Sequence, residues 1–353
     1  MLLRPQYTCF LIAFVACIGV NLLIIRIQSS YVPSSVLASL QAYNSDLSRE
    51  LFDTSIVNVE RDKITALPSL RADRNLSTHS KQVLDICAEN NLRTAVTRRN
   101  FLYSSENHGL YCWIRKAGST SFTKLFTDMK HRRRSGNYYR EIPFLSPKIQ
   151  LSLKSLIKNP RIFKLLVVRH PFERIVSAYR DRIEDNSKYT AQSWIHVPKI
   201  FHLTRPDLFV TVGMFDRSLS RIFHEDKRLK LVPTFQEFIT WLLLQDSTKD
   251  DPHWNQYFRH CSLCSVRFDY VLKLDNYTKK EVDYIFDKLH LNNQLSYLPK
   301  LEQSRKGITN FDVACNYFKN LSKEAVVNLY EKYRIDFEMF NYEFSKYFEC
   351  TGD

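Results

Sequence analysis

Short apolar runs alternate with amphipathic segments from about residue 85 to the end of the chain, a pattern typical of an α/β domain. The run Tyr111–Ile114 is aromatic and β-branched, and Phe163–Val168 has the apolar character of a strand buried on both faces. Phe268–Leu274 resembles a third strand. Residues at helical spacing follow each run. The pattern predicts one α/β domain over residues 85–353, with a central parallel sheet flanked by helices.

The N-terminus has a different pattern. No charged residue occurs from Tyr7 to Ile25, between Arg4 and Arg26. As a helix this run spans roughly 28 Å, close to the ~30 Å hydrocarbon core of a bilayer. It exceeds the ~7–15 apolar residues of a signal peptide, and no Ala-x-Ala pattern follows it. We expect a cytoplasmic tail at 1–6 and a transmembrane signal anchor at 7–27, with a cleaved signal peptide or a buried soluble helix as alternatives.

Residues 28–84 mix polar and apolar positions without a sustained period, as expected of a stem. Sequons and cysteines beyond the anchor fit an oxidising lumen, although chance sequons and reduced core cysteines are the alternative. The sequons are at Asn75, Asn276 and Asn320, and the six cysteines are Cys87, Cys112, Cys261, Cys264, Cys315 and Cys350. Together they favour a type II membrane protein whose folded domain is luminal.

The chain carries 51 Lys and Arg against 37 Asp and Glu, a formal charge of +14. Such an excess favours polyanions, whether nucleic acid, anionic membrane or acidic polysaccharide. A luminal domain does not meet nucleic acid, so we expect an acidic glycan or an anionic nucleotide as the partner. The basic run Lys130–Arg134 is either a contact for an acidic polymer or a solvated loop.

One anion-binding motif directly follows the first predicted strand. Its residues are Arg115, Lys116, Ala117, Gly118, Ser119, Thr120 and Ser121, followed by apolar residues at helical spacing. A strand, a tight turn with glycine and a helix aim backbone N–H groups and the positive end of the helix dipole at one point. The spacing of a nucleoside-triphosphate P-loop is absent. A capped helix with a surface lysine is the alternative interpretation.

A second motif begins where the Phe163–Val168 strand ends. Arg169 leaves the strand, Pro171 suits a first helical position, and Ser177 projects from the following helix with Arg174 and Arg180 three residues away on either side. An arginine supplies paired donors to a phosphate and a serine supplies a neutral one. The alternative is an amphipathic helix with solvated arginines.

These two motifs, in this order and about 50 residues apart, resemble the 5′-phosphosulfate loop and the 3′-phosphate site of the sulfotransferases. The segment from Arg169 to Asp181 is especially similar to the Golgi carbohydrate branch, which includes the chondroitin 4-O, dermatan 4-O and HNK-1 enzymes. The blocks 251–270 and 333–342 agree with that branch. The resemblance covers about residues 110–345. One departure is Arg115, which stands where the family usually has proline.

The resemblance implies a P-loop-like sulfotransferase domain and a Golgi location. It implies transfer of a sulfuryl group from 3′-phosphoadenosine 5′-phosphosulfate (PAPS) to a sugar hydroxyl, without a metal. Lys116 would contact the bridging oxygen, the residues Gly118 to Ser121 would hold the 5′-phosphate, and Arg169 and Ser177 would hold the 3′-phosphate.

Histidine suits the general base for the attacking hydroxyl at neutral pH. His253 is our candidate, His196 and His202 are alternatives, and we interpret His170 as structural. Cys261 and Cys264 are expected in disulfides rather than on zinc. The expected acceptor is O-4 of GalNAc in chondroitin, with dermatan, terminal glucuronate and N-glycan GalNAc as alternatives. A non-catalytic glycan-binding protein would have lost Lys116, Arg169 or Ser177, and all three are present. A kinase would show acidic metal ligands near the loop.

Overall fold

The computed structural model describes residues 81–130, 137–185, 190–207, 232–291 and 307–352, all within the compact unit Ala66–Asp353. The predicted anchor at 7–27, most of the stem, Asn75 and positions 131–134 of the basic run lie outside these residues. Within the described ranges no helix is both long and apolar enough to cross a bilayer.

The sheet has four strands in the order β1-β2-β3-β4. They are β1 (Phe101–Ser104), β2 (Gly109–Cys112), β3 (Phe163–Val168) and β4 (Tyr270–Lys273). β2, β3 and β4 are parallel, whereas β1 pairs antiparallel with β2. The sheet is therefore mixed: β2, β3 and β4 form the predicted parallel part, and β1 adds an antiparallel strand that the sequence did not predict. The sequence reading missed β1 because a four-residue strand joined to β2 by a tight hairpin carries little periodicity.

The second predicted strand has the bounds expected of it, but the first does not. β2 ends at Cys112 because Trp113 already donates its backbone N–H to Asn100, outside the ladder, and Ile114 begins a turn. All six residues of β3 are buried, as expected of a strand covered on both faces.

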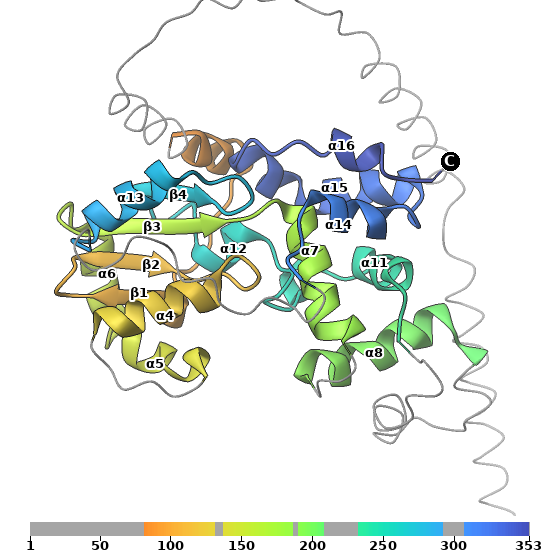
Figure 1. The fold of residues 1–353 in the computed structure, drawn as a ribbon, viewed down its shortest axis with the longest axis horizontal. Helices are drawn as coiled ribbons and strands as arrows, with labels where there is room; N and C mark the ends of the chain where they lie inside the picture. Colours follow the sequence, from red (N-terminus) through yellow and green to blue (C-terminus); the bar gives the residue numbers. More distant parts are fainter. Residues whose placement is uncertain (1–80, 131–136, 186–189, 208–231, 292–306, 353) are drawn as a thin grey trace, which may run out of the picture. The chain divides into compact units, whose positions relative to one another are not determined.

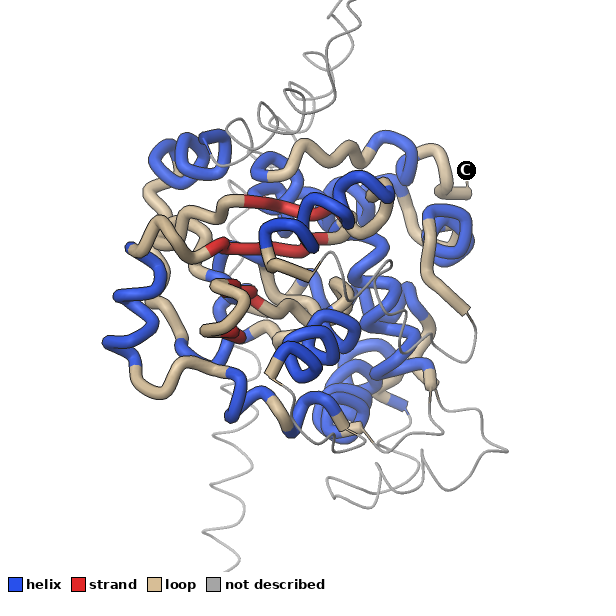
Figure 2. The backbone as a smooth tube through the Cα atoms, turned by 60° about the vertical axis from the view of Figure 1, so that its left-hand side comes forward, coloured by secondary structure: helices blue, strands red, loops and turns tan. Residues whose placement is uncertain are grey.

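Helices cover both faces of the sheet (Figures 1 and 2). Leu165 and Val167 of β3 point to one face and Leu166 and Val168 to the other, so the strand contributes to two separate cores. The first face is covered by α4 (Ser119–Met129), α5 (Ile142–Leu145) and α13 (Lys279–Lys288). The second is covered by helix 81–89, α6 (Gln150–Lys158), α12 (Tyr257–Cys261) and the end of α15 (Lys323–Met339).

A helical region with its own aromatic core lies beyond the carboxyl end of β3 (Figure 1). It contains α7 (Pro171–Tyr179), α8 (Ala191–Thr204), α11 (Phe235–Leu243), α14 (Phe311–Phe318), α15 and α16 (Ser345–Phe348). Short 3₁₀ turns occupy Arg98–Asn100, Tyr138–Arg140 and Ser247–Lys249, and a π-helical turn occupies Arg180–Glu184. α7 joins the two regions, because it begins directly after β3 and packs into the helical core.

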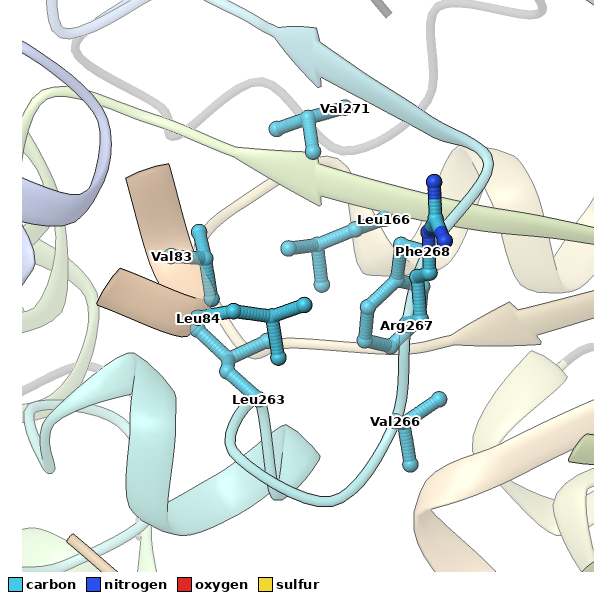
Figure 3. A pocket seen from close by; sticks show the side chains of 8 residues that line it. All are labelled: Val83, Leu84, Leu166, Leu263, Val266, Arg267, Phe268 and Val271. Atoms are coloured by element: carbon cyan, nitrogen blue, oxygen red, sulfur yellow. The ribbon is translucent and has the colours of Figure 1, made fainter. Parts of the chain in front are cut away.

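Helix 81–89 packs on the second face of the sheet, with Val83 and Ile86 buried. The packed domain thus includes residues on the N-terminal side of position 85. Beneath this helix is a small apolar hollow (Figure 3). Its lining residues are Val83, Leu84, Leu166, Leu263, Val266, Arg267, Phe268 and Val271. Neither anion-binding motif contributes to it, so this hollow belongs to the core and not to a reaction site.

Three disulfides use all six cysteines beyond the predicted anchor: Cys87–Cys264, Cys112–Cys261 and Cys315–Cys350. The prediction that Cys261 and Cys264 belong to disulfides is confirmed. The first two bridges are nested, and they tie helix 81–89 and β2 to the segment that joins α12 to β4. The two bridges stabilise this side of the sheet, where the helices come from four distant parts of the chain.

We predict that the variant Cys112→Ala/Cys261→Ala loses about 3–4 kcal/mol of unfolding free energy, because the chain between the two nested bridges closes a loop of roughly 30 residues. Denaturant titration with the other two bridges intact measures this loss. Cys315→Ala/Cys350→Ala is the matched control, since its cysteines are 35 residues apart and one of them is only partly buried. The two loops are of similar length, but Cys112 and Cys261 are both fully buried, so their removal also costs packing. A smaller loss of unfolding free energy for this variant than for the control contradicts the prediction.

Candidate active site at the carboxyl edge of the sheet

The carboxyl ends of β2, β3 and β4 meet at one edge of the sheet, because these strands are parallel. The predicted turn at 115–118 follows β2, and Arg169 follows β3. Asp275 follows β4 and accepts a hydrogen bond of 3.0 Å from the backbone N–H of His170. The structure therefore brings the two predicted anion motifs to the same edge, facing the helical region.

The turn after β2 has two residues with left-handed backbone conformations, Lys116 with φ 66° and Gly118 with φ 69°. A side chain at Gly118 would be strained, and its Cβ would lie 3.4 Å from the side chain of Leu274. Ala117 is buried and donates its N–H to Ile114. The helix α4 starts at Ser119, and because its N-cap residue is Gly118, no N-cap side chain accepts from the first N–H groups of the helix. The predicted order of strand, tight turn and helix is present, and the positive end of α4 lies at the site.

The hydroxyls of this first helical turn have a common neighbour. Ser119 Oγ lies 2.8 Å and Thr120 Oγ1 3.2 Å from the hydroxyl of Tyr139, in the segment that precedes α5. Ser121, the third predicted hydroxyl, is partly buried on the same turn. Tyr139 belongs to no motif, so nothing in the sequence pattern pointed to it.

Lys116 lies beside an acidic partner that comes from the second motif. Its Nζ is 3.0 Å from Asp181 Oδ2, and the same carboxylate oxygen is 2.9 Å from Nε of Arg182. Burial lowers the pKa of Lys116, while Asp181 acts in the opposite direction and the charges of Arg182 and Arg169 add to the lowering. Asp181 thus holds an otherwise costly ammonium group at the edge of the sheet.

Arg169 connects the two motifs. Its Nη1 donates to the backbone carbonyl of Lys116 at 3.4 Å, its Nε lies 3.3 Å from Glu173, and its Nη2 donates to the carbonyl of Thr309. Arg180 donates to the hydroxyl of Thr309 at 2.7 Å. Thr309 therefore contacts the arginine that precedes α7 and the arginine that follows it.

Ser177 projects from the face of α7 that also carries Glu173, one helical turn earlier. It is partly buried. The arginines three residues on either side of it are not solvated, since Arg174 is 1% and Arg180 4% exposed. The alternative interpretation of α7 as an amphipathic helix with solvated arginines is wrong. Both guanidinium groups lie inside the protein, where backbone carbonyls accept from Arg174 and the hydroxyl of Thr309 accepts from Arg180.

Arg174 makes the most extensive of these contacts. Its Nε donates to the carbonyl of Arg115 at 3.0 Å, its Nη1 to the carbonyl of Asn255 at 2.6 Å, and its Nη2 to the carbonyl of Pro252 at 3.3 Å. Its guanidinium also lies over the ring of Tyr257, 4.7 Å from the centroid. One side chain thus fixes the turn after β2 relative to the segment that carries His253.

His253, the candidate base, is buried beside Asp251. Its Nδ1 is 2.6 Å from Asp251 Oδ1, and its Nε2 is 3.4 Å from Nη1 of Arg115. Burial lowers the pKa of His253 to about 4; the charges of Arg115 and Arg182 add to this, and Asp251 opposes it. Burial alone would raise the pKa of Asp251, but the imidazoles of His196 and His253 hold it well below its usual range. The pair is therefore a neutral imidazole and a carboxylate near neutral pH.

The other histidines have different surroundings. His196 Nε2 lies 3.9 Å from the second oxygen of Asp251 and packs on Trp241 and Trp254, so it supports the carboxylate of the pair. His202 is exposed near the end of α8, which extends away from the sheet (Figure 1). His170 caps α7, bonds the carbonyl of Glu343 and packs among aromatic rings, as expected of a structural residue.

Sequence reasoning missed several residues of this edge. Asp181 and Asp251 lie inside segments that the sequence analysis identified, but no role was predicted for either carboxylate. Tyr139 and Thr309 are single residues in connecting segments and carried no signal. Asn276 and Asn320 are exposed, as glycosylation requires. Within the described part of the chain, no three His, Cys, Asp or Glu side chains gather as metal ligands would.

Residues 99–343 match the profile of the sulfotransferase family. The chain belongs to this family. Among similar proteins is carbohydrate sulfotransferase 11 of Mus musculus, 26% identical over 324 residues, which are 87% of this chain and 82% of the relative. Carbohydrate sulfotransferase 8 of Mus musculus is 24% identical over 271 residues, 71% of this chain and 58% of the relative. No solved structure matches.

The family predicted from the motifs is thereby confirmed, and with it the class of enzyme. A sulfotransferase uses PAPS as its sulfuryl donor. The match includes both motifs, Arg115 to Ser121 and Arg169 to Asp181, and the segment that carries Asp251 and His253. The sulfotransferase profile thus covers the whole edge of the sheet described above.

We predict that Arg174→Lys lowers the free energy of unfolding of the sulfotransferase domain by about 2–4 kcal/mol, because a lysine leaves buried carbonyl groups without donors. Denaturant titration of the purified domain measures the change. Arg161→Lys is the matched control, since Arg161 is exposed before β3 and a surface exchange shifts stability by about 0.5 kcal/mol or less. A loss for Arg174→Lys no larger than for the control contradicts the prediction.

Proposed function

We propose that the protein is a luminal carbohydrate sulfotransferase of the Golgi membrane, which transfers a sulfuryl group from PAPS to a hydroxyl of a glycosaminoglycan. The acceptor position we propose is O-4 of GalNAc in chondroitin. The observation that carries the proposal is the contact between Arg169 and the carbonyl of Lys116, because it joins the two anion motifs into one site.

The residues of this edge fit a doubly phosphorylated donor. Lys116, the positive end of α4 and the hydroxyls of Ser119 and Thr120 lie on one side of the contact. The buried guanidinium of Arg169 and the hydroxyl of Ser177 lie on the other, on the segment after β3. Guanidinium, ammonium, hydroxyl and backbone N–H groups are the donors that proteins use for phosphate and sulfate oxygens.

PAPS supplies an electrophilic sulfur, whose bond to the bridging oxygen breaks as a bond to the sugar oxygen forms. We assign Lys116 to the bridging oxygen, where its ammonium group stabilises the negative charge of the leaving group. The first turn of α4, from Gly118 to Ser121, holds the 5′-phosphate through backbone N–H groups. Arg169 and Ser177 hold the 3′-phosphate, for which Arg169 exchanges the neutral carbonyl of Thr309 for charged phosphate oxygens.

His253 takes the proton of the attacking hydroxyl at Nε2. The carboxylate of Asp251 accepts the Nδ1 hydrogen, fixes this tautomer and stabilises the imidazolium that forms. This division of roles leaves Lys116 on the leaving-group side of the reaction and His253 on the attacking side. The contact of Arg174 with both segments keeps the two sides in register.

The acceptor class rests on the similarity to proteins named carbohydrate sulfotransferases and on the excess of basic residues, +14 overall. Dermatan, terminal glucuronate and N-glycan GalNAc are the alternative acceptors. The predicted anchor at 7–27 would hold the domain at the luminal face of the membrane. Disaccharide analysis of the sulfated product distinguishes these acceptors, because it identifies both the sugar and the hydroxyl that receive the sulfate.

We predict that Lys116→Ala and Arg169→Ala each reduce transfer of labelled sulfate from PAPS to desulfated chondroitin by about 100-fold or more. Arg169→Ala also weakens binding of adenosine 3′,5′-bisphosphate, measured by calorimetry, because the 3′-phosphate loses its charged partner. Lys124→Ala is the matched control, since Lys124 pairs with Asp128 within α4 and keeps the fold of the turn intact. Normal transfer by both site variants contradicts the assignment.

We predict that His253→Gln lowers kcat by about 100-fold or more while affinity for adenosine 3′,5′-bisphosphate stays the same. Because the pKa of His253 is lowered to about 4, the base is neutral above that pH, and kcat/KM of the wild type changes little from pH 5.5 to 7.5. His108→Gln is the control, since His108 is exposed in the turn before β2, at the opposite edge of the sheet. A wild-type profile that rises steeply near pH 6.5 contradicts the assignment of the buried His253.

A further inference from the structure

Arg115 occupies an unusual position beside the proposed reaction centre. The carbon of its guanidinium lies 5.2 Å from the ring centroids of both Trp113 and Tyr139. Arg115 is partly buried, and it directly precedes Lys116 in the turn. Two aromatic faces therefore hold a planar cation at the carboxyl edge of the sheet.

The charge of Arg115 lacks the compensation that its neighbours have. Lys116 pairs with Asp181 and Arg169 with Glu173, whereas no ion pair of the described residues involves Arg115. Burial lowers the pKa of Arg115, with Tyr139 and Asp251 opposing and Arg182 adding to the effect. A guanidinium that is stacked, partly desolvated and without a carboxylate at hydrogen-bond distance is well suited to bind an anionic group from outside.

The polar contact of Arg115 is with the candidate base. Asp251 accepts the hydrogen on Nδ1 of His253, so Nε2 carries the lone pair and accepts from Nη1 of Arg115 at 3.4 Å. The same lone pair must receive the proton of the attacking hydroxyl. A carboxylate accepts a stronger hydrogen bond from a guanidinium than a neutral imidazole does, so an acidic acceptor would draw Arg115 away from Nε2.

We propose that Arg115 binds the carboxylate of a hexuronate residue adjacent to the sugar that is sulfated, and that this contact releases Nε2 of His253 to act as base. The inference rests on the proposed function and deepens it, since it names the acidic group that the acceptor must carry. Arg115 is then a specificity-determining residue that makes the enzyme respond to the acidic polymer and not to its neutral analogue.

The test compares desulfated chondroitin with the same polymer after reduction of its carboxyl groups to alcohols. For the wild type we expect kcat/KM to fall by about tenfold to hundredfold on the reduced acceptor, the range of a hydrogen-bonded charged contact. For Arg115→Gln we expect the ratio of the two kcat/KM values to approach one. Arg161→Gln removes the same charge at an exposed position before the amino end of β3, away from the site, and retains the wild-type ratio.

The outcomes separate the inference from the proposed function. Equal use of both acceptors by the wild type, or an unchanged ratio in Arg115→Gln, overturns the inference while the enzyme remains a chondroitin sulfotransferase. Absence of wild-type transfer to any glycan overturns the proposed function instead. If Arg115→Gln transfers to neither acceptor, calorimetry with the two oligosaccharides decides, since lost discrimination in binding supports the inference and retained discrimination overturns it.

A pH profile supplies a second readout that loss of structure would not move. Asp251, Arg115 and Arg182 act on His253 directly, and His196 acts through Asp251. The positive charge of Arg115 lowers the pKa of His253, so Arg115→Gln should raise it. The acid limb of kcat/KM then moves to higher pH in Arg115→Gln but not in Arg161→Gln. An unchanged acid limb in Arg115→Gln contradicts the coupling between the two side chains.

Discussion

The site depends on the buried guanidinium of Arg174. Its donors reach the carbonyl of Arg115 on one side and those of Pro252 and Asn255 on the other, while its plane lies on Tyr257. A buried cation is tolerated only when its hydrogen-bonding groups are satisfied, so these contacts hold as a set. The turn after β2 and the segment carrying His253 are thereby fixed relative to each other, although 138 residues separate Arg115 from His253.

Around this constraint, each charged group has an assigned partner. Asp181 compensates Lys116, Glu173 compensates Arg169, and Asp251 holds His253 in one tautomer. The pairing allows several cations to lie close together at one edge without a prohibitive cost of desolvation. The pairing also gives Lys116, Arg169 and His253 different electrostatic surroundings, because each lies beside a different carboxylate. Arg115 is the exception to this pairing, and its partly buried charge is therefore the one to which we assign recognition of an anionic group.

The sequence predicted those parts of the fold that depend on local contacts. The Phe163–Val168 strand, the turn at Gly118 and the start of α7 at Pro171 follow from residues within a few positions of each other. β1 was missed although its pairing with β2 is local, because a four-residue strand carries little periodicity. The buried state of Arg174 could not be predicted either, since its partners lie 59 and 81 residues away and an arginine on an amphipathic helix is normally solvated.

The same distinction separates the half of the site that we assign to the donor from the half that we assign to the acceptor. The donor half consists of two strand-to-helix junctions, whose geometry follows from residues close together in the sequence. The acceptor half brings together Trp113, Arg115, Tyr139 and His253 from three distant segments, with stacking and one hydrogen bond between them. Motifs therefore identify the nucleotide that a sulfotransferase binds, whereas the recognition of the sugar that we propose depends on long-range contacts that no motif records. A single cation at position 115, directly before Lys116, connects the two proposed halves, because it shares a turn with the lysine and a hydrogen bond with His253, the proposed base.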